Sequence, residues 1–124
     1  MIWVVLHMLL FGGGGDASLA RPFERVRTAV QKAVGEPSRL AEAEAILTQV
    51  DEALAAHRAQ REQAFAAWSE LAKRRDVTKA DLQARIRDCA AAKAAFDARL
   101  VGLRFALRDV LTRAEWQQVC PAPR

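Results

Sequence analysis

Residues 68–86 read WSELAKRRDVTKADLQARI, and they contain a short break between two long stretches of helical pattern. Asp76 and Val77 interrupt the pattern. The sequence TKAD at 78–81 then forms a capping box, with Asp81 in place of the usual Glu at the third helical position. Two long helices joined by so short a connection have to run antiparallel. The segment therefore predicts the bend of a helical hairpin.

Apolar residues on both sides of the break recur in alternating steps of four and three, the period of helices packed in a coiled coil. The first helix is predicted from Ser38, as its N-cap, to Arg75, and the second from Thr78 to about Leu111. We call the positions at which the two helices are expected to meet the seam. In the first helix the seam is Ala43, Leu47, Val50, Leu54, His57, Arg61, Ala64, Trp68 and Leu71. In the second helix it is Leu82, Ile86, Cys89, Lys93, Phe96, Leu100, Leu103, Leu107 and Val110.

Two shorter helices flank the hairpin. Residues 21–34, RPFERVRTAVQKAV, have apolar residues at helical spacing, and Gly35-Glu36-Pro37 ends the pattern. Residues 112–115, TRAE, form a full capping box that opens a last short helix. The predicted fold is all-α: a long antiparallel helical hairpin with a short N-terminal helix and a short C-terminal helix.

The composition supports one such domain. The chain has 124 residues, of which 52% are hydrophobic and 27% charged, so it is not a disordered chain. Each long helix spans roughly 50 Å at 1.5 Å per residue. The two short helices can cover only the end away from the bend. The other end needs a partner, and we expect a homodimer.

The N-terminus is a hydrophobic leader. Residues 1–11, MIWVVLHMLLF, are too few to span a membrane, which takes about 20 apolar residues, but they match the apolar core of a signal peptide. Ser18 and Ala20 suit a cut after Ala20, although no Lys or Arg precedes Arg21. We therefore divide the chain into a leader with a Gly linker, residues 1–20, and a hairpin domain, residues 21–124. The leader is a signal peptide or a retained membrane anchor, and a core element of a cytosolic domain is the alternative.

Charge and motifs exclude several function classes. The net charge is +4, but basic and acidic residues are interspersed, which is typical of a solvated helix surface, so we expect no nucleic-acid partner. The chain contains no H-x-x-x-H, H-E-x-x-H or C-x-x-C spacing and no phosphate-binding P-loop. We therefore predict no catalytic residue, no cofactor and no metal site, and the protein is not expected to be an enzyme.

Four residues of the seam are not ordinary apolar core residues, and each needs an interpretation. His57 is expected to pack, half-buried, against Phe96 across the seam. Arg61 and Lys93 face each other, so their side chains reach outward, the seam opens there, or they form a basic patch for an acidic partner. Cys89 is predicted to be a small core residue.

Three further residues lie near the ends of the helices. Cys120 is placed on an exposed tail, where an interchain disulfide is the alternative to a free thiol. Trp68 and Trp116 are expected to pack in the core rather than to form a binding surface.

Residues 58–119 resemble the periplasmic heavy-metal sensor and resistance family, the Spy-, CpxP- and CnrX-like helical hairpin proteins. The stretches that carry the resemblance are REQAFAAWSELAKRRDVTKADLQARI and FDARLVGLRFALRDVLTRAEWQQV. The family opens its final helix with an L-T-x-x-Q motif. Here Leu111 and Thr112 match that motif, and Glu115 stands where Gln is typical.

The resemblance implies a periplasmic protein-binding module in envelope stress or metal resistance, either chaperone-like or regulatory. Its partner would be an unfolded client or a regulatory protein. Because His57 is the only His after the leader, the resemblance transfers no metal site. The alternatives are a metal or stress sensor tethered to the inner membrane through residues 1–11, and a small structural subunit of a membrane complex. The residues expected to bind the partner are Arg58, Arg61, Arg85, Lys93 and Trp68.

Overall fold

The computed structural model describes residues 17–121 of the chain, and of residues 17–23 the backbone alone. This part forms four helices and no strand, which confirms the all-α prediction. None of the described helices is long and apolar enough to cross a membrane. The leader predicted at residues 1–11 lies outside the described residues. The helices are α2 (Ala17–Ala33), α3 (Pro37–Lys73), α4 (Lys79–Val110) and α5 (Arg113–Val119).

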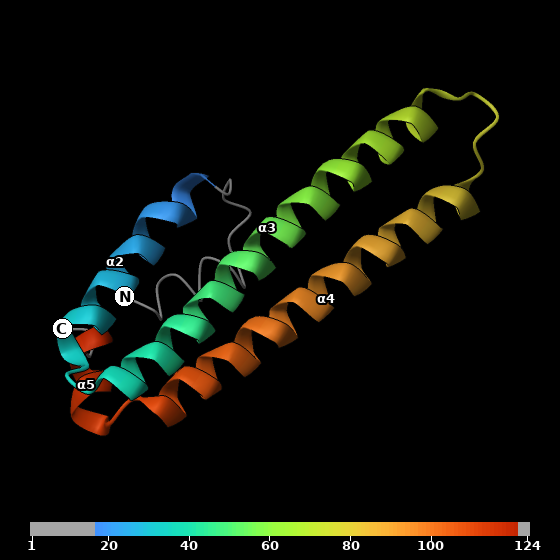
Figure 1. Ribbon diagram of the computed structural model, residues 1–124. Coiled ribbons are helices and arrows are strands. Elements are labelled where there is room, and N and C mark those ends of the chain that lie inside the picture. Colours follow the sequence, from blue (N-terminus) through green and yellow to red (C-terminus); the bar gives the residue numbers. More distant parts are fainter. Residues whose placement is uncertain (1–16, 122–124) are drawn as a thin grey trace.

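The two long helices lie side by side and are joined by a short loop at one end, residues 74–78 (Figure 1). The helices α2 and α5 gather at the opposite end, where α2 contacts both α3 and α5. With 37 residues, α3 is about 55 Å long. Among residues 17–121, the structure is therefore thick at one end, and at the other α3 and α4 are covered by neither α2 nor α5.

The register between α3 and α4 is fixed near mid-length by an aromatic pair. The imidazole of His57 stacks on the ring of Phe96, with 3.9 Å between the ring centroids and 5° between the planes. This is the pair predicted from the two seams. His57 is half-buried, as expected for a packing residue.

Both predicted capping boxes are present. At the start of α4, the Thr78 hydroxyl accepts a hydrogen bond from the Asp81 amide at 3.1 Å, and the Asp81 carboxylate accepts one from the Thr78 amide at 3.2 Å. Thr112 and Glu115 make the same reciprocal pair at the start of α5, at 3.2 and 2.8 Å. These bonds satisfy backbone amides that have no partner within the helix.

The starts of the other two helices differ from the prediction. Glu36, not Ser38, is the N-cap of α3, because Pro37 takes the first helical position, where no backbone N–H is needed. Ser38 lies in the first turn, and its hydroxyl donates to Glu36 Oε1 at 2.7 Å. Helix α2 begins at Ala17 rather than Arg21. Cleavage after Ala20 stays a prediction.

The hydrophobic core lies wholly at the thick end. Val26 and Val30 of α2, with Val34 just after its last residue, belong to one buried cluster with residues of α3, α4 and α5. None of residues 54–95 is buried. The buried residues elsewhere in the core are Ala43, Leu47, Val50, Ala53, Phe96, Leu100, Leu103, Leu107, Leu111, Val119 and Cys120.

The burial pattern overturns the predictions for both cysteines. Cys89, predicted to be a small core residue, is exposed, as is Ile86 on the same seam of α4, at 57%. Two helices alone leave most of each surface to water, and no third helix reaches this far along the described chain. Cys120 is buried rather than on an exposed tail, because α5 folds back against the core.

Candidate functional site

The candidate site is the part of the helix pair that α2 and α5 leave uncovered. We call residues 54–95 the distal arm, and residues 17–53 with 96–121 the closed end. All five residues predicted to bind a partner lie on the distal arm, and all are exposed. They are Arg58, Arg61, Trp68, Arg85 and Lys93.

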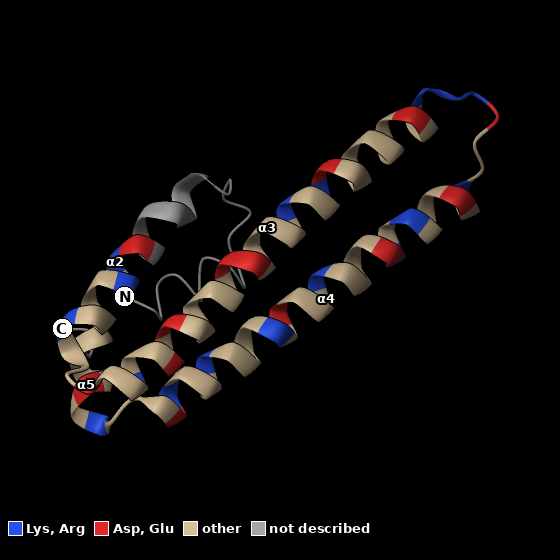
Figure 2. Ribbon diagram, viewed as in Figure 1, with Lys and Arg blue, Asp and Glu red and all other residues tan. Residues whose placement is uncertain are grey.

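The distal arm also holds the net charge of the protein. Residues 58–93 contain nine Lys and Arg and five Asp and Glu, a difference of +4, equal to the net charge of the whole chain. Figure 2 shows blue segments recurring along this half of the helix pair, with a blue loop at its end. The remaining residues are therefore neutral on balance. Positive charge is concentrated where the core is absent.

Large apolar side chains are exposed beside this charge. Phe65 is 73% exposed and Trp68 37%, both on α3, and Ile86 is exposed on α4. The expectation that Trp68 packs in the core is thus wrong, for the same reason as for Ile86. Trp116 does pack against the core, with the Arg104 guanidinium 5.2 Å from the centroid of its ring.

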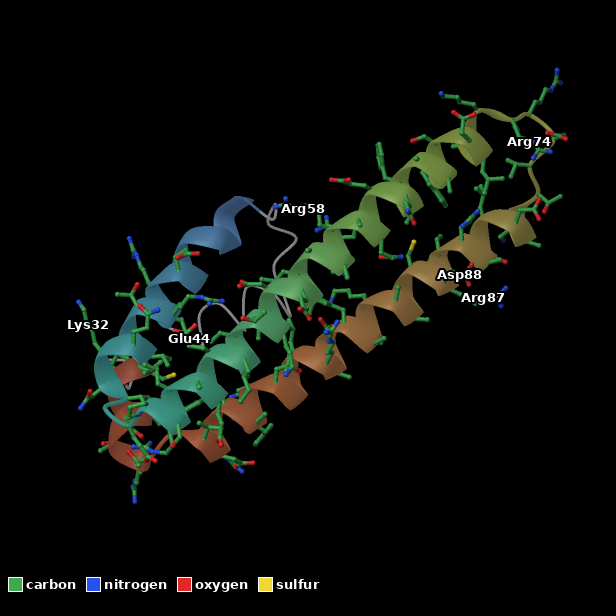
Figure 3. All side chains as sticks on the ribbon, in the orientation of Figure 1. Lys32, Glu44, Arg58, Arg74, Arg87 and Asp88 are labelled. Carbon is green, nitrogen blue, oxygen red and sulfur yellow. The ribbon has the colours of Figure 1, made fainter. Side chains whose placement is uncertain are left out.

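A stripe of α3 connects the two parts of the molecule. Glu44, Asp51, Arg58 and Phe65 follow one another at intervals of seven residues, so they lie on nearly the same face of the helix. At the closed end this face carries α2, because the Arg27 guanidinium donates to Glu44 at 2.9 Å and also to Asp51. In Figure 3, Glu44 lies beside α2, whereas Arg58 lies beyond the N-terminal part of that helix.

The facing cations Arg61 and Lys93 are both directed outward. Both side chains are exposed, and the Lys93 amine lies 2.9 Å from Asp97 Oδ2, one helical turn along α4. An exposed pair of this kind contributes only about 0.3–0.5 kcal/mol, so it does not lock the amine in place. The exposure of both side chains agrees with the outward interpretation, and a basic patch for an acidic partner stays a prediction.

Ion pairs at the end of the distal arm are equally open to water. Lys73 lies 3.4 Å from Glu70, and Arg74 lies 3.1 Å from Asp76. Figure 3 shows Arg74 on the loop and Arg87 projecting outward from α4. Exposed pairs are worth roughly 0–1 kcal/mol, so the arm can exchange them for contacts with a partner.

Leu111, Thr112 and Glu115, the residues of the motif that resembles L-T-x-x-Q, have a structural role at the closed end. Leu111 is buried, Thr112 caps α5, and Glu115 is 7% exposed. The Glu115 carboxylate accepts hydrogen bonds from the Arg39 guanidinium and from the Thr112 amide, and Arg39 also binds Glu36 at 2.9 Å. The hydrogen bond from Arg39, followed by that from Thr112, lowers the pKa of Glu115 to about 2. The same contact with Glu115 raises the pKa of Arg39.

Arg39 is not among the residues predicted from the sequence. Its partner lies 76 positions away, and no helical period links them. The one local signal is Glu115 itself, because a carboxylate at a position where the resembled family has Gln calls for a cation nearby.

The side chains of the distal arm are suited to non-covalent contacts with a partner. Among the described residues, no group of three His, Cys, Asp or Glu side chains could hold a metal ion. The Cys89 thiol is exposed and the Cys120 thiol is buried. What the arm presents is positive charge beside exposed aromatic and aliphatic surface, a combination suited to polar and apolar contacts with one partner.

No protein-family model, curated protein or solved structure matches this chain. The resemblance to the Spy-, CpxP- and CnrX-like proteins stays a prediction, and the function has to be inferred from the surface of the distal arm.

Proposed function

We propose that the protein is a binding module that holds other proteins against its distal arm, with the long antiparallel hairpin as its working unit. One observation carries the proposal. Residues 54–95 contribute no buried side chain, yet they hold the excess positive charge and expose Phe65, Trp68 and Ile86. A surface of this kind on a soluble domain marks an interaction site.

The magnitudes favour reversible binding. Complete burial of one large apolar side chain contributes roughly 1.5–3 kcal/mol. Phe65, Trp68 and Ile86 are 73%, 37% and 57% exposed, so complete burial of all three would contribute about 2.5–5 kcal/mol, near the lower end of the roughly 4–15 kcal/mol lost as translational and rotational freedom on association. Charge contacts then decide whether the complex forms. The module would therefore bind and release its partners readily, as a chaperone-like or regulatory protein does.

The compartment follows from the leader alone. An apolar segment at residues 1–11 and small residues before Arg21 support a periplasmic protein that acts in envelope stress or metal resistance. Its partner is an unfolded client or a regulatory protein, and a homodimer is the expected assembly. The mass of the native protein tests this: a form that begins at Arg21 in the periplasm supports it, and a full-length form in the cytosol contradicts it.

The binding function is tested by the suppression of aggregation of an unfolded client. Phe65→Ser removes the most exposed aromatic of the distal arm. Phe105→Ser is the matched control, because Phe105 is also exposed on a long helix, at 42%, but lies at the closed end beneath the Arg104 and Arg108 guanidinium groups. We expect a several-fold loss of suppression for Phe65→Ser alone. Equal loss in both variants, or no suppression by the unaltered protein, contradicts the proposal for clients.

A membrane-tethered regulatory subunit is the second candidate, and the apolar character of residues 1–11 is the observation that favours it. In that case the full-length chain would be recovered in the membrane fraction. The distal arm would then bind a regulatory protein, and the Phe65→Ser variant would lose that partner in place of the client.

A further inference from the structure

We propose that the segment captured by the distal arm is an acidic amphipathic α-helix, which lies on α3 and α4 in line with α2. The inference rests on the proposed binding function and names the class of its partner. It follows from three features: how α2 is bound, how the balance of charge along α3 changes where α2 begins, and how long the uncovered face is.

Helix α2 shows how this face receives a helix. It packs against α3 and α5, and its apolar residues Val26 and Val30 are almost completely buried. Beside these residues, Arg27 contacts the carboxylates of Glu44 and Asp51, and the Gln31 amide donates to Glu44 at 2.9 Å. The helix is thus held by apolar packing together with charge pairing of a defined sign.

Beyond the N-terminal end of α2 the balance of charge on this face changes to positive, with Arg58 and Arg61 against one carboxylate, Glu62. The stripe that carries Glu44 and Asp51 continues through Arg58 to Phe65. Arg61 lies on the adjacent ridge of α3, and the exposed Lys93 lies across the seam on α4. A helix on this part of the face therefore needs carboxylates where α2 has Arg27, and apolar residues over Phe65. Each close charge pair contributes about 1 kcal/mol in water, and more where water is excluded.

The length of the face fits a helix of ordinary size. From Arg58 to Ala72 the stripe covers about 21 Å at 1.5 Å per residue, which is about four turns. Helix α2 itself has 17 residues. A second copy of this chain is a poorer occupant of this face, because it would bring an arm of charge +4 against another of the same charge, so the expected homodimer would form through another surface.

The test uses the full-length protein and three synthetic 16-residue peptides. The first is an amphipathic helix with leucines on one face and glutamates on its flanks. The second carries lysine in place of each glutamate, and the third is a scrambled form of the first without an apolar face. We expect the acidic amphipathic peptide to bind at least ten-fold more tightly than either control in calorimetry. Its circular dichroism should gain helix on binding, and its affinity should fall as salt is raised.

Charge reversal on the protein sharpens the test. Arg58→Glu combined with Arg61→Glu should invert the preference, so that the basic peptide binds more tightly than the acidic one. Arg25→Glu combined with Arg99→Glu is the matched control, because both residues are exposed cations of the closed end. This control should keep the original preference. Thermal melting of both double variants verifies that they fold.

The possible outcomes separate this inference from the proposed function. Equal affinity for the acidic, basic and scrambled peptides overturns the acidic helix, and if clients are still protected the binding function stands. If the unaltered protein neither binds the peptides nor protects clients, both proposals are wrong. A dimer in sedimentation that Phe65→Ser dissociates assigns the face to a second copy. Anionic vesicles that bind and are not displaced by the acidic peptide assign it to a lipid surface. Either of these last two results overturns the inference.

Discussion

Arg39 and Glu115 form an ion pair that ties the first turn of α3 to the first turn of α5. The Glu115 carboxylate also completes the capping box of α5 through the Thr112 amide. One side chain thus orients α5 and attaches it to α3. Because α5 contributes Val119 to the core and is followed there by Cys120, this contact helps to close the thick end of the molecule.

Glu115→Gln should destabilise the protein even though it restores the Gln of the resembled family's motif. Gln can still accept the hydrogen bond of the Thr112 amide, but it leaves the half-buried Arg39 with the exposed Glu36 as its remaining carboxylate partner. We expect a loss of about 1–2 kcal/mol in the free energy of unfolding from urea denaturation. Glu52→Gln, at an exposed position of α3, is the control and should change it by less than about 0.5 kcal/mol. Equal stability of both variants would contradict the role given to the pair.

The same contact predicts acid sensitivity. The pKa of Glu115 is lowered from its ordinary value of 4.5 to about 2, so the ionised form stabilises the folded state. That contribution is complete above about pH 4.5 and is lost as the pH falls towards 2. The melting temperature should decline over this window. The decline should be shallower in Glu115→Gln, and parallel curves for the two proteins would argue against Glu115 as the titrating group.

Truncation of an aliphatic side chain should destabilise the protein strongly at the closed end and only slightly on the distal arm. Leu47→Ala creates a cavity in the core of the closed end and should cost about 2–5 kcal/mol. Ile86→Ala on the distal arm should change stability by less than about 0.5 kcal/mol, since the side chain is already exposed and Ala is a good helix former. Both values come from urea denaturation. A large cost for Ile86→Ala would mean that its side chain is covered in solution.

Thiol labelling should distinguish the two cysteines. Cys89 is exposed and Cys120 is buried, so a maleimide should modify Cys89 rapidly in the folded protein and Cys120 only after denaturation. Mass spectrometry of tryptic peptides identifies the labelled site. The Cys89→Ser variant should lose the rapid phase. Rapid labelling of Cys120 would show that α5 does not stay against the core.

Local patterns in the sequence predicted the four helices and the register at which His57 of α3 meets Phe96 of α4. Both capping boxes predicted the starts of α4 and α5, because a cap depends on residues three positions apart. The 4–3 period of two helices predicted that His57 meets Phe96. The start of α3 was misplaced by two residues because Pro37 was taken to precede the helix, although Pro suits its first position.

The burial of individual seam residues could not be predicted from these local patterns. A period identifies the face that a helix turns towards a neighbour, but it does not show how far that neighbour extends. Ile86, Cys89 and Trp68 continue the periodic seam beyond the reach of α2, and all three are exposed. The concentration of charge was hidden for a related reason. Charges summed along each helix appear mixed, whereas the bend brings the basic parts of both long helices to the same end.

The absence of a core in the distal arm has a consequence for evolution. In most small domains, residues that recognise a partner also help to hold the fold together, so a change of specificity carries a risk of unfolding. Here the two groups are separated along the helices, with no buried side chain between Leu54 and Ala95. Substitutions on the distal arm can therefore accumulate with little effect on folding. The same scaffold could diverge to recognise new partners while the closed end stays unchanged.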